Sequence, residues 1–119
     1  MYKALYLSPM IPSFNMKETI SFFISLLDFK VGRNDTSYAI LYKDHLTIHI
    51  LPAGTDIGQG EFYLEVDNVE QLWNAIKDKL GNIKHKPPFD RDYGMREIHI
   101  AVPQTNTLLF IGTVLRIKP

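Results

Sequence analysis

The sequence contains no cysteine, and its charges leave no excess of either sign. The absence of cysteine excludes disulfide bonds, thiolate metal sites and cysteine nucleophiles, and it fits a reducing compartment. Thirteen Lys and Arg residues balance thirteen Asp and Glu residues, so the formal net charge is zero. A neutral chain has no broad basic field for nucleic acid or an anionic membrane, so we expect neither as a partner.

Long apolar runs are also missing. No stretch approaches the roughly 18 apolar residues of a membrane-spanning helix. Residues 1–12 lack the charged segment, apolar run and small-residue cleavage site of a secretory signal. We therefore expect a cytoplasmic protein. Hydrophobic residues make up 45% of the 119 residues and charged residues 22%, which is the composition of one globular domain with a real core.

The first half of the chain has the pattern of a strand, a helix and three strands. The apolar run at residues 4–11 predicts a strand closed by Pro12. Apolar residues at helical spacing then predict a helix over residues 16–27, capped by Ser13 or Asn15. Three short apolar segments separated by turn-forming residues predict strands at residues 29–32, 38–42 and 46–51.

After a glycine-rich linker at about residues 53–60, the same order begins again. Phe62, Leu64 and Val66 alternate with polar residues, which predicts a strand with one buried face. Asn68 caps a second predicted helix, whose apolar stripe ends before Gly81. The remaining predicted elements are strands near residues 83–85, 95–102 and 108–114, and a loop that contains Pro87 and Pro88.

A shift of 53 positions superposes the two predicted helices. It places Asn15 on Asn68 and Met16 on Val69, and the apolar stripes then agree without a gap. Because the order of the elements and the register of the helices agree independently, the sequence predicts an internal duplication. We expect one domain spanning residues 1–119, with repeat one at about residues 3–52 and repeat two at about residues 61–114.

Several short segments carry a resemblance to a known family. In the first half these are Ser21-Phe22-Phe23 and Leu26-Leu27-Asp28-Phe29, where Asp28 stands in place of the usual glycine. In the tail, Tyr93-Gly94-Met95-Arg96-Glu97 precedes Val102-Pro103-Gln104-Thr105-Asn106. The tail is similar to the Gly-x-Arg-Glu and Asp-Pro-Asp-Gly-Asn pattern of bleomycin resistance proteins, although the second block keeps only its proline and asparagine. The sequence thus resembles the vicinal oxygen chelate superfamily of glyoxalases, bleomycin resistance proteins and dioxygenases, in its bleomycin-resistance-like branch.

This resemblance implies an α+β fold, in which two βαβββ repeats form a cupped mixed sheet with the helices on its convex side. It also implies a homodimer. Metal-dependent members of the superfamily place ligands on the first and last strand of each unit. The corresponding positions here fall on Ser8 and Glu61, on Leu109, and near Ile48. Only Glu61 is a good ligand, and one carboxylate cannot replace the hydration shell of a divalent ion, so we expect no metal and no other cofactor.

Strand alternation predicts which side chains line the cup. Glu61 and Tyr63 share one face of their strand, and Ser8 lies on the equivalent face of the first strand. Arg96 and Glu97 are adjacent in a strand and therefore point to opposite faces, so only one of them faces the cup. Glu61 is expected to face the cup together with Tyr63, or to pair with Arg96, or to be solvated.

The third predicted strand presents either Tyr38 and Tyr42 or Ala39 and Leu41 to the cup. The tyrosines are preferred because their hydroxyl groups tolerate water. No catalytic residue is assigned. The candidate ligand-binding residues are Ser8, Tyr38, Tyr42, Glu61, Tyr63 and Arg96.

Other polar and aromatic residues are interpreted as structural. The histidines form no helical pair of ligands, so strand or surface positions are favoured over a metal site at a dimer interface; they are His45, His49, His85 and His99. Trp73 lies on the apolar stripe of its helix, which favours core packing over ligand stacking. A solvated surface is the interpretation for Lys77, Lys79, Lys84 and Lys86.

Three functions are compatible with these observations. An aromatic cup with one carboxylate suits capture of a planar, partly apolar organic compound. Zero net charge is unfavourable for bleomycin itself, because an acidic cavity would help to bind that cationic glycopeptide. The alternative is an enzyme: a glyoxalase, lyase or dioxygenase with a non-standard metal site, or a metal-free isomerase with Glu61 as base. The third is a purely structural dimer. We expect a sequestering protein without catalytic activity.

Overall fold

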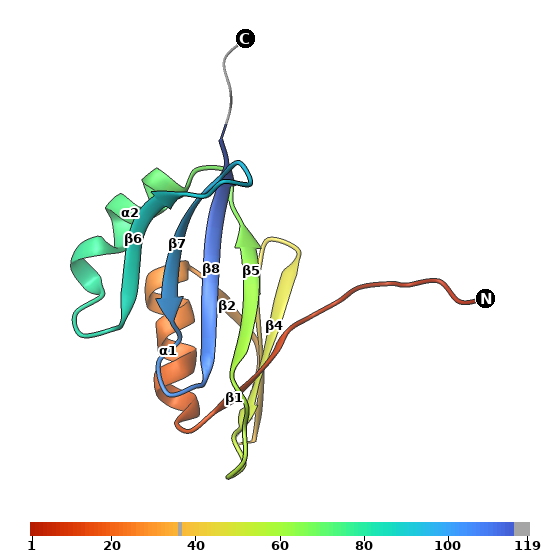
Figure 1. The fold of residues 1–119 in the computed structure, drawn as a ribbon. Helices are drawn as coiled ribbons and strands as arrows, with labels where there is room; N and C mark the ends of the chain where they lie inside the picture. The colour runs from red at the N-terminus through yellow and green to blue at the C-terminus, as the bar shows by residue number, and fades with distance from the viewer. Residues whose placement is uncertain (36, 116–119) are drawn as a thin grey trace. The chain divides into compact units, whose positions relative to one another are not determined.

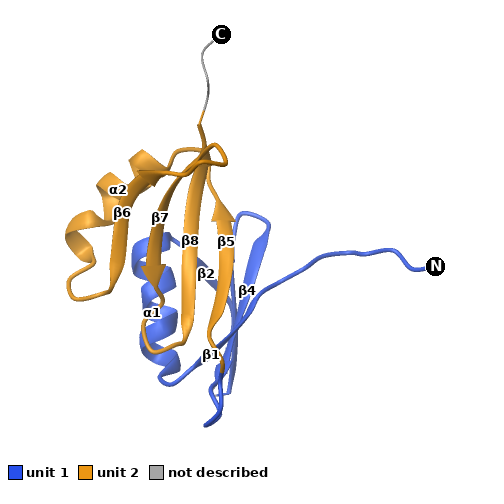
Figure 2. Cartoon of the chain, in the orientation of Figure 1, with its two compact units in different colours: residues 1–57 blue, residues 58–119 orange. Residues whose placement is uncertain are grey.

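The computed structural model describes residues 1–35 and 37–115. The chain divides into two compact units between Ile57 and Gly58, within the segment that the sequence predicts as a linker (Figure 2). Each unit is a four-stranded mixed sheet with a helix against one face (Figure 1). The predicted α+β fold with two βαβββ repeats is confirmed.

The first unit contains β1 (Met10–Ser13), α1 (Met16–Leu27), β2 (Lys30–Asp35), β3 (Tyr38–Lys43) and β4 (Leu46–Pro52). The strand order in its sheet is β1-β4-β3-β2, and β1 pairs with β4 in parallel. The bounds of α1 are those predicted, because the Asn15 side chain accepts a hydrogen bond from the backbone N–H of Glu18. Asp28 ends the helix with φ 58°. This left-handed backbone explains why the family pattern has glycine at this position.

The first strand differs from its prediction. Residues 4–11 were expected to form it, but β1 spans Met10–Ser13 and residues 1–7 are exposed. In the parallel register Met10 lies opposite His49, and β4 begins at Leu46. Residues before Leu7 therefore have no partner strand, although their apolar character is that of a strand.

The second unit contains β5 (Gly60–Glu65), α2 (Val69–Ile76), a 3₁₀ turn η1 (Lys77–Lys79), β6 (His85–Asp90), β7 (Met95–Ala101) and β8 (Thr107–Val114). Its sheet has the order β5-β8-β7-β6, with β5 and β8 parallel. Asn68 caps α2 by accepting a hydrogen bond from the backbone N–H of Gln71 at 3.0 Å, as predicted. The two sheets thus share one strand order, which is what an internal duplication produces.

The prediction that Pro87 and Pro88 lie in a loop is wrong. Both lie inside β6, at a shift in the pairing register between Lys86 and Phe89. Because β6 is the edge strand of its sheet, prolines without N–H groups are tolerated there.

Apolar side chains alternate along the strands and pack beneath each helix. Fully buried members in the first unit are Ile11, Phe23, Ala39, Leu41 and Ile50. Those in the second unit are Val69, Ile76, Ile98, Ile100, Leu109 and Ile111. The polar residues of the same strands consequently point to the opposite face of each sheet. No helix within residues 1–35 and 37–115 is long and apolar enough to span a membrane.

Candidate functional site

The face of the second sheet that points away from α2 carries an unusual concentration of polar and aromatic side chains. Strand pairing places Tyr63 opposite Phe110, and Phe110 opposite His99. Glu97 lies on the same face, two residues before His99 on β7. We call this surface the face opposite α2.

Glu97 is the centre of this cluster, and its side chain has 0% exposed surface. Arg91 donates from Nη1 to its Oε1 at 3.3 Å, and His99 donates from Nε2 to the same oxygen at 2.8 Å. The hydroxyl groups of Tyr63 and Tyr93 also donate to this carboxylate. A buried carboxylate is stable only when its oxygens are satisfied in this way.

The cluster shifts the acidity of its members. Burial raises the pKa of Glu97, but hydrogen bonds from His99, Tyr93 and Tyr63 and the nearby Arg91 cation outweigh it, so the net pKa lies below its ordinary value. Burial raises the pKa of Tyr63 well above the ordinary value, and its bond to Glu97 adds to the rise. At neutral pH the carboxylate is therefore ionised and both tyrosines keep their protons.

A glycine makes room for the bond between Tyr63 and Glu97. A Cβ atom on Gly112 would lie 1.9 Å from the Tyr63 hydroxyl oxygen and 3.0 Å from Glu97 Cγ. Real Cβ atoms are never this close to another heavy atom, so the tyrosine reaches the carboxylate only because residue 112 has no side chain.

Glu97 also fixes the ring of His99, which packs with the rings of Phe110 and Phe89. We call these three rings the aromatic wall. Because an ionised carboxylate only accepts hydrogen bonds, the Nε2 of His99 carries a proton and its ring cannot rotate freely. The ring stacks on Phe110, with centroids 3.9 Å apart and planes 27° apart. Phe89 meets the same ring edge-on at 4.9 Å. The Nδ1 atom of His99 has no partner among the described residues.

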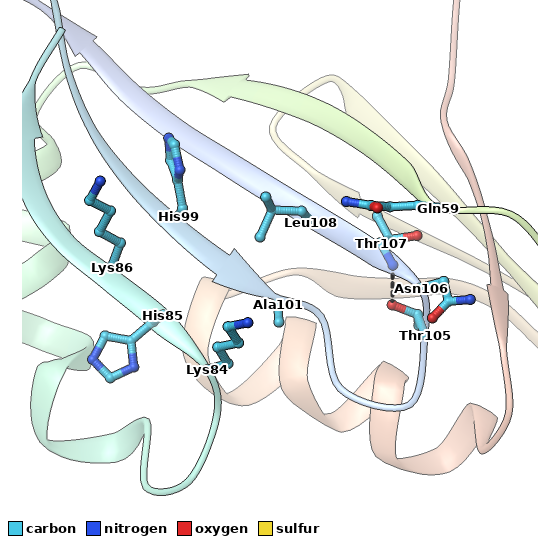
Figure 3. A pocket seen from close by; sticks show the side chains of 10 residues that line it. All are labelled: Gln59, Lys84, His85, Lys86, His99, Ala101, Thr105, Asn106, Thr107 and Leu108. Atoms are coloured by element: carbon cyan, nitrogen blue, oxygen red, sulfur yellow. Dashed lines mark hydrogen bonds between the residues drawn. The ribbon is translucent and has the colours of Figure 1, made fainter.

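A hollow of about 720 Å³ lies beside this wall in the second unit (Figure 3). Figure 3 shows Lys86 and His99 on one side of the sheet and His85 on the other, where it contacts Trp73 of α2. We call it the second-unit hollow. Its lining includes Lys84, Lys86, His99, Ala101, Thr107 and Leu108.

The predicted residues of the first unit lie on the face of its sheet away from α1. Ala39 and Leu41 are fully buried, so Tyr38 and Tyr42 point the other way, as preferred from the sequence. Tyr38 shares a 2.6 Å hydrogen bond with Nδ1 of His49. Ser8 donates from Oγ to the carbonyl oxygen of Thr47 at 2.8 Å. Whether these groups bind a ligand stays a prediction.

In the second unit, Glu61 and Tyr63 lie on the face opposite α2, as alternation predicts. Arg96 lies on the other face, where its guanidinium pairs with Asp90 at 2.6 Å and with Glu70 of α2 at 2.9 Å. Arg96 was a candidate ligand-binding residue from the sequence, but of these two adjacent residues it is Glu97 that lies on the face opposite α2.

Leu109 and Ile48 do not lie on the sheet faces where metal ligands were expected. Ile48 and Leu109 are buried on the helix side, while Thr47, His49, Leu108 and Phe110 lie on the faces where ligands were expected. Residues 1–35 and 37–115 contain no group of three or more His, Asp or Glu side chains arranged to hold a metal.

The pairing of Glu97 with His99 was not predicted from the sequence. Their i, i+2 spacing in a predicted strand placed them on one face, and Tyr63 was already assigned to the corresponding face of its own strand. The pairing of β5 and β7 with opposite edges of β8 is what joins the three side chains, and that register was not predicted.

No family model and no curated protein matches this sequence. The fold is nevertheless shared with solved structures. A bleomycin resistance determinant encoded on the transposon Tn5 aligns with a TM-score of 0.78 at 19% identity, over 93% of this chain and 98% of that one. The bleomycin-binding protein from Streptomyces verticillus, complexed with copper(II)-bleomycin, aligns with a TM-score of 0.75 at 18% identity, over 98% and 100%. A lactoylglutathione lyase from Agrobacterium tumefaciens aligns with a TM-score of 0.76 at 10% identity, over 93% and 94%.

The chain therefore shares its fold with these bleomycin-binding and lyase structures, as the sequence resemblance implied. Both binding proteins and enzymes have this fold, so the function has to be argued from the site.

Proposed function

We propose that this protein captures a planar or aromatic organic molecule on the face opposite α2, without a metal and without converting it. The observation that carries the proposal is the second-unit hollow of about 720 Å³ beside the stacked rings of His99 and Phe110. Small-molecule pockets commonly have volumes of roughly 300–1,000 Å³ and apolar or aromatic walls with a few polar groups.

The cluster around Glu97 supports this proposal because it makes the wall rigid before a ligand arrives. The carboxylate holds His99 against Phe110, and four donors hold the carboxylate. A side chain that is already fixed loses little conformational entropy on binding, which favours affinity.

Proteins of the same fold bind an antibiotic, as the copper(II)-bleomycin complex indicates. Bleomycin itself is a poor fit here. The charged side chains that line the hollow are Lys84 and Lys86, which repel a cation, and the whole chain is neutral. We expect a different planar compound.

The direct test is a thermal-shift screen against aromatic antibiotics, including bleomycin, with divalent metals as a separate arm. An organic compound should raise Tm without added metal. Leu108→Asp should abolish the shift because it removes an apolar contact of the ligand ring and places a carboxylate in the hollow. Val114→Asp, on the same strand but 55% exposed and outside the hollow, should leave the shift intact. Stabilisation that requires a metal would contradict the proposal.

An enzymatic alternative has one specific observation in its favour. His99 bonds a carboxylate through Nε2 and leaves Nδ1 available, which is how a general base is oriented in many enzymes. This residue fits the role better than Glu61, which is exposed and lacks an orienting partner in the cluster. Mass spectrometry of a bound compound separates the functions: capture returns it unchanged, whereas an enzyme alters its mass or its isomer composition.

We also propose that the protein is a homodimer. Apolar side chains in the N-terminal segment are strongly exposed, with Leu5 at 86%, Tyr6 at 74% and Leu7 at 97%. Several adjacent exposed apolar residues indicate a surface that another chain covers.

A further inference from the structure

The fully charged side chains that line the second-unit hollow are all positive. Lys84 and Lys86 line it, and no Asp or Glu is among its lining residues. We propose, building on the proposed function, that the hollow selects planar molecules that carry an anionic oxygen group, a carboxylate or a phosphate, and that these two lysines bind that group.

The two lysines lie two residues apart, with Lys86 inside β6 and Lys84 immediately before it. Lys86 pairs in register with His99, and the carbonyl of Lys84 accepts a hydrogen bond from the N–H of Ala101 at 2.9 Å. The residue between them, His85, turns to the other face. Both lysine side chains line the hollow together with His99 (Figure 3).

No carboxylate of residues 1–35 and 37–115 neutralises either ammonium group. Neither lysine forms an ion pair with a carboxylate among the described residues. Lys86 instead holds its Nζ 4.1 Å from the centre of the Phe89 ring, a cation–π contact that fixes it beside the aromatic wall. An unpaired cation next to an aromatic surface attracts a ligand with an anionic end and a flat body.

The carboxylates on the same face do not cancel this charge. Glu97 has no exposed side-chain surface, and the Arg91 cation and the hydrogen bond from His99 compensate it. Glu61 lies opposite Leu108 in register, but it is not a lining residue. The hollow is thus locally basic in a chain whose net charge is zero.

The arrangement predicts how such a ligand lies. Its anionic oxygens meet Lys84 and Lys86, and its ring rests on Leu108 toward the His99 ring. A neutral analogue keeps the ring contacts but loses the charge interaction, and a cationic analogue is repelled.

The test uses four probes that share a naphthalene ring: 2-naphthoate, 2-naphthyl phosphate, neutral 2-naphthamide and cationic 2-naphthylmethylammonium. Binding is measured by isothermal titration calorimetry at low and high ionic strength. The variants are Lys84→Met and Lys86→Met, with Lys79→Met as the control, because Lys79 is an exposed lysine of the same unit in η1 and outside the hollow.

We expect the anionic probes to bind more tightly than the amide, and the cationic probe to bind most weakly. Each hollow variant should weaken anion binding by about two- to fivefold, the usual size for an exposed ion pair, and leave amide binding unchanged. Salt should weaken anion binding in the wild type, because it screens exposed charges. Lys79→Met should behave as the wild type. The comparison of naphthoate with naphthyl phosphate identifies which oxyanion the hollow prefers.

Failure of this inference is distinguishable from failure of the proposed function. If all four probes bind with similar affinity, or the cation binds best, the charge selectivity is wrong and capture of planar molecules stands. If none of the probes binds, and no compound of the thermal-shift screen does so either, the proposed function itself is overturned.

Discussion

Glu97 is an ionised side chain with no exposed surface, so the stability of the protein should report its protonation. Its folded-state pKa lies below the ordinary value of 4.5, which means that the fold favours the charged form. The resulting stabilisation is complete above the unfolded-state pKa and is lost as the pH falls through the lower, folded-state pKa.

The variant Glu97→Gln tests this at the residue scale. At pH 7 it should lower the free energy of unfolding by about 2 kcal/mol, because it removes the charge that its donors stabilise. The difference from the wild type should begin to shrink below about pH 4.5, where the carboxyl group of the unfolded chain takes up its proton, and should be lost once the pH falls below the lower, folded-state pKa. Urea denaturation from pH 7 to pH 3 measures it. Glu65→Gln, an exposed residue on the same face, is the control, and a pH-independent difference would contradict the prediction.

Gly112→Ala should disrupt the same cluster by steric means. The added methyl group overlaps the Tyr63 hydroxyl, so the ring has to move away from Glu97. We expect a loss of about 1–3 kcal/mol in the free energy of unfolding, the usual cost of overpacking. Gly60→Ala is the matched control in the same sheet, because its Cβ would meet nothing closer than 3.6 Å. Equal free energies of unfolding for the two variants would contradict the prediction, because they would show that the Tyr63 ring moves aside without cost.

The sequence predicted the strand faces but not the cluster built on them. Alternation correctly assigned Tyr63 to the exposed face of β5 and preferred Tyr38 and Tyr42 over their buried neighbours. The position of Glu97 against Tyr63 depends on residues 34 positions apart being brought together across β8. Local pattern carries no information about such a register, which is fixed only when the whole sheet forms.

At the scale of the elements, the helices were the best predicted parts, because their signals are local. Each helix begins at an asparagine whose side chain accepts a backbone hydrogen bond three residues on: Asn15 for α1 and Asn68 for α2. The strands at the edges were predicted less well. The extent of β1 depends on where its partner β4 begins, and the inclusion of Pro87 in β6 depends on that strand lying at the edge.

The shared capping arrangement gives a matched pair of variants. Asn15→Ala and Asn68→Ala should each lower the free energy of unfolding by about 1 kcal/mol, because each leaves a helix N–H group without its acceptor. Asn74→Ala, at an exposed position inside α2, should leave stability unchanged or raise it slightly, because alanine has the higher helix propensity. Thermal unfolding measures all three. A loss for Asn74→Ala as large as the cap losses would contradict the capping argument.

At the scale of the whole molecule, the repeated βαβββ unit explains how a chain of 119 residues builds two similar sheets with different surfaces. The first unit presents tyrosines and His49 on its face away from α1, whereas the second presents the Glu97 cluster and two lysines. After a duplication, the two units can keep their buried apolar residues while the side chains on the opposite faces become different.

The proposed homodimer predicts the effect of the N-terminal segment on assembly. Leu5→Asp combined with Leu7→Asp should shift the protein toward the monomer, because charges replace apolar side chains that a partner covers. Sedimentation velocity at micromolar concentration measures the distribution. Lys3→Asp, which changes charge in the same segment without removing apolar surface, is the control. A wild-type protein that sediments as a monomer would overturn the proposal.

The two prolines of β6 restrict how copies of this protein meet. Pro87 and Pro88 have no backbone N–H group, so β6 lacks two of the donors of an ordinary strand. They lie at a shift in the pairing register of the edge strand of the sheet. Addition of a strand from another copy of the protein to this edge is therefore disfavoured.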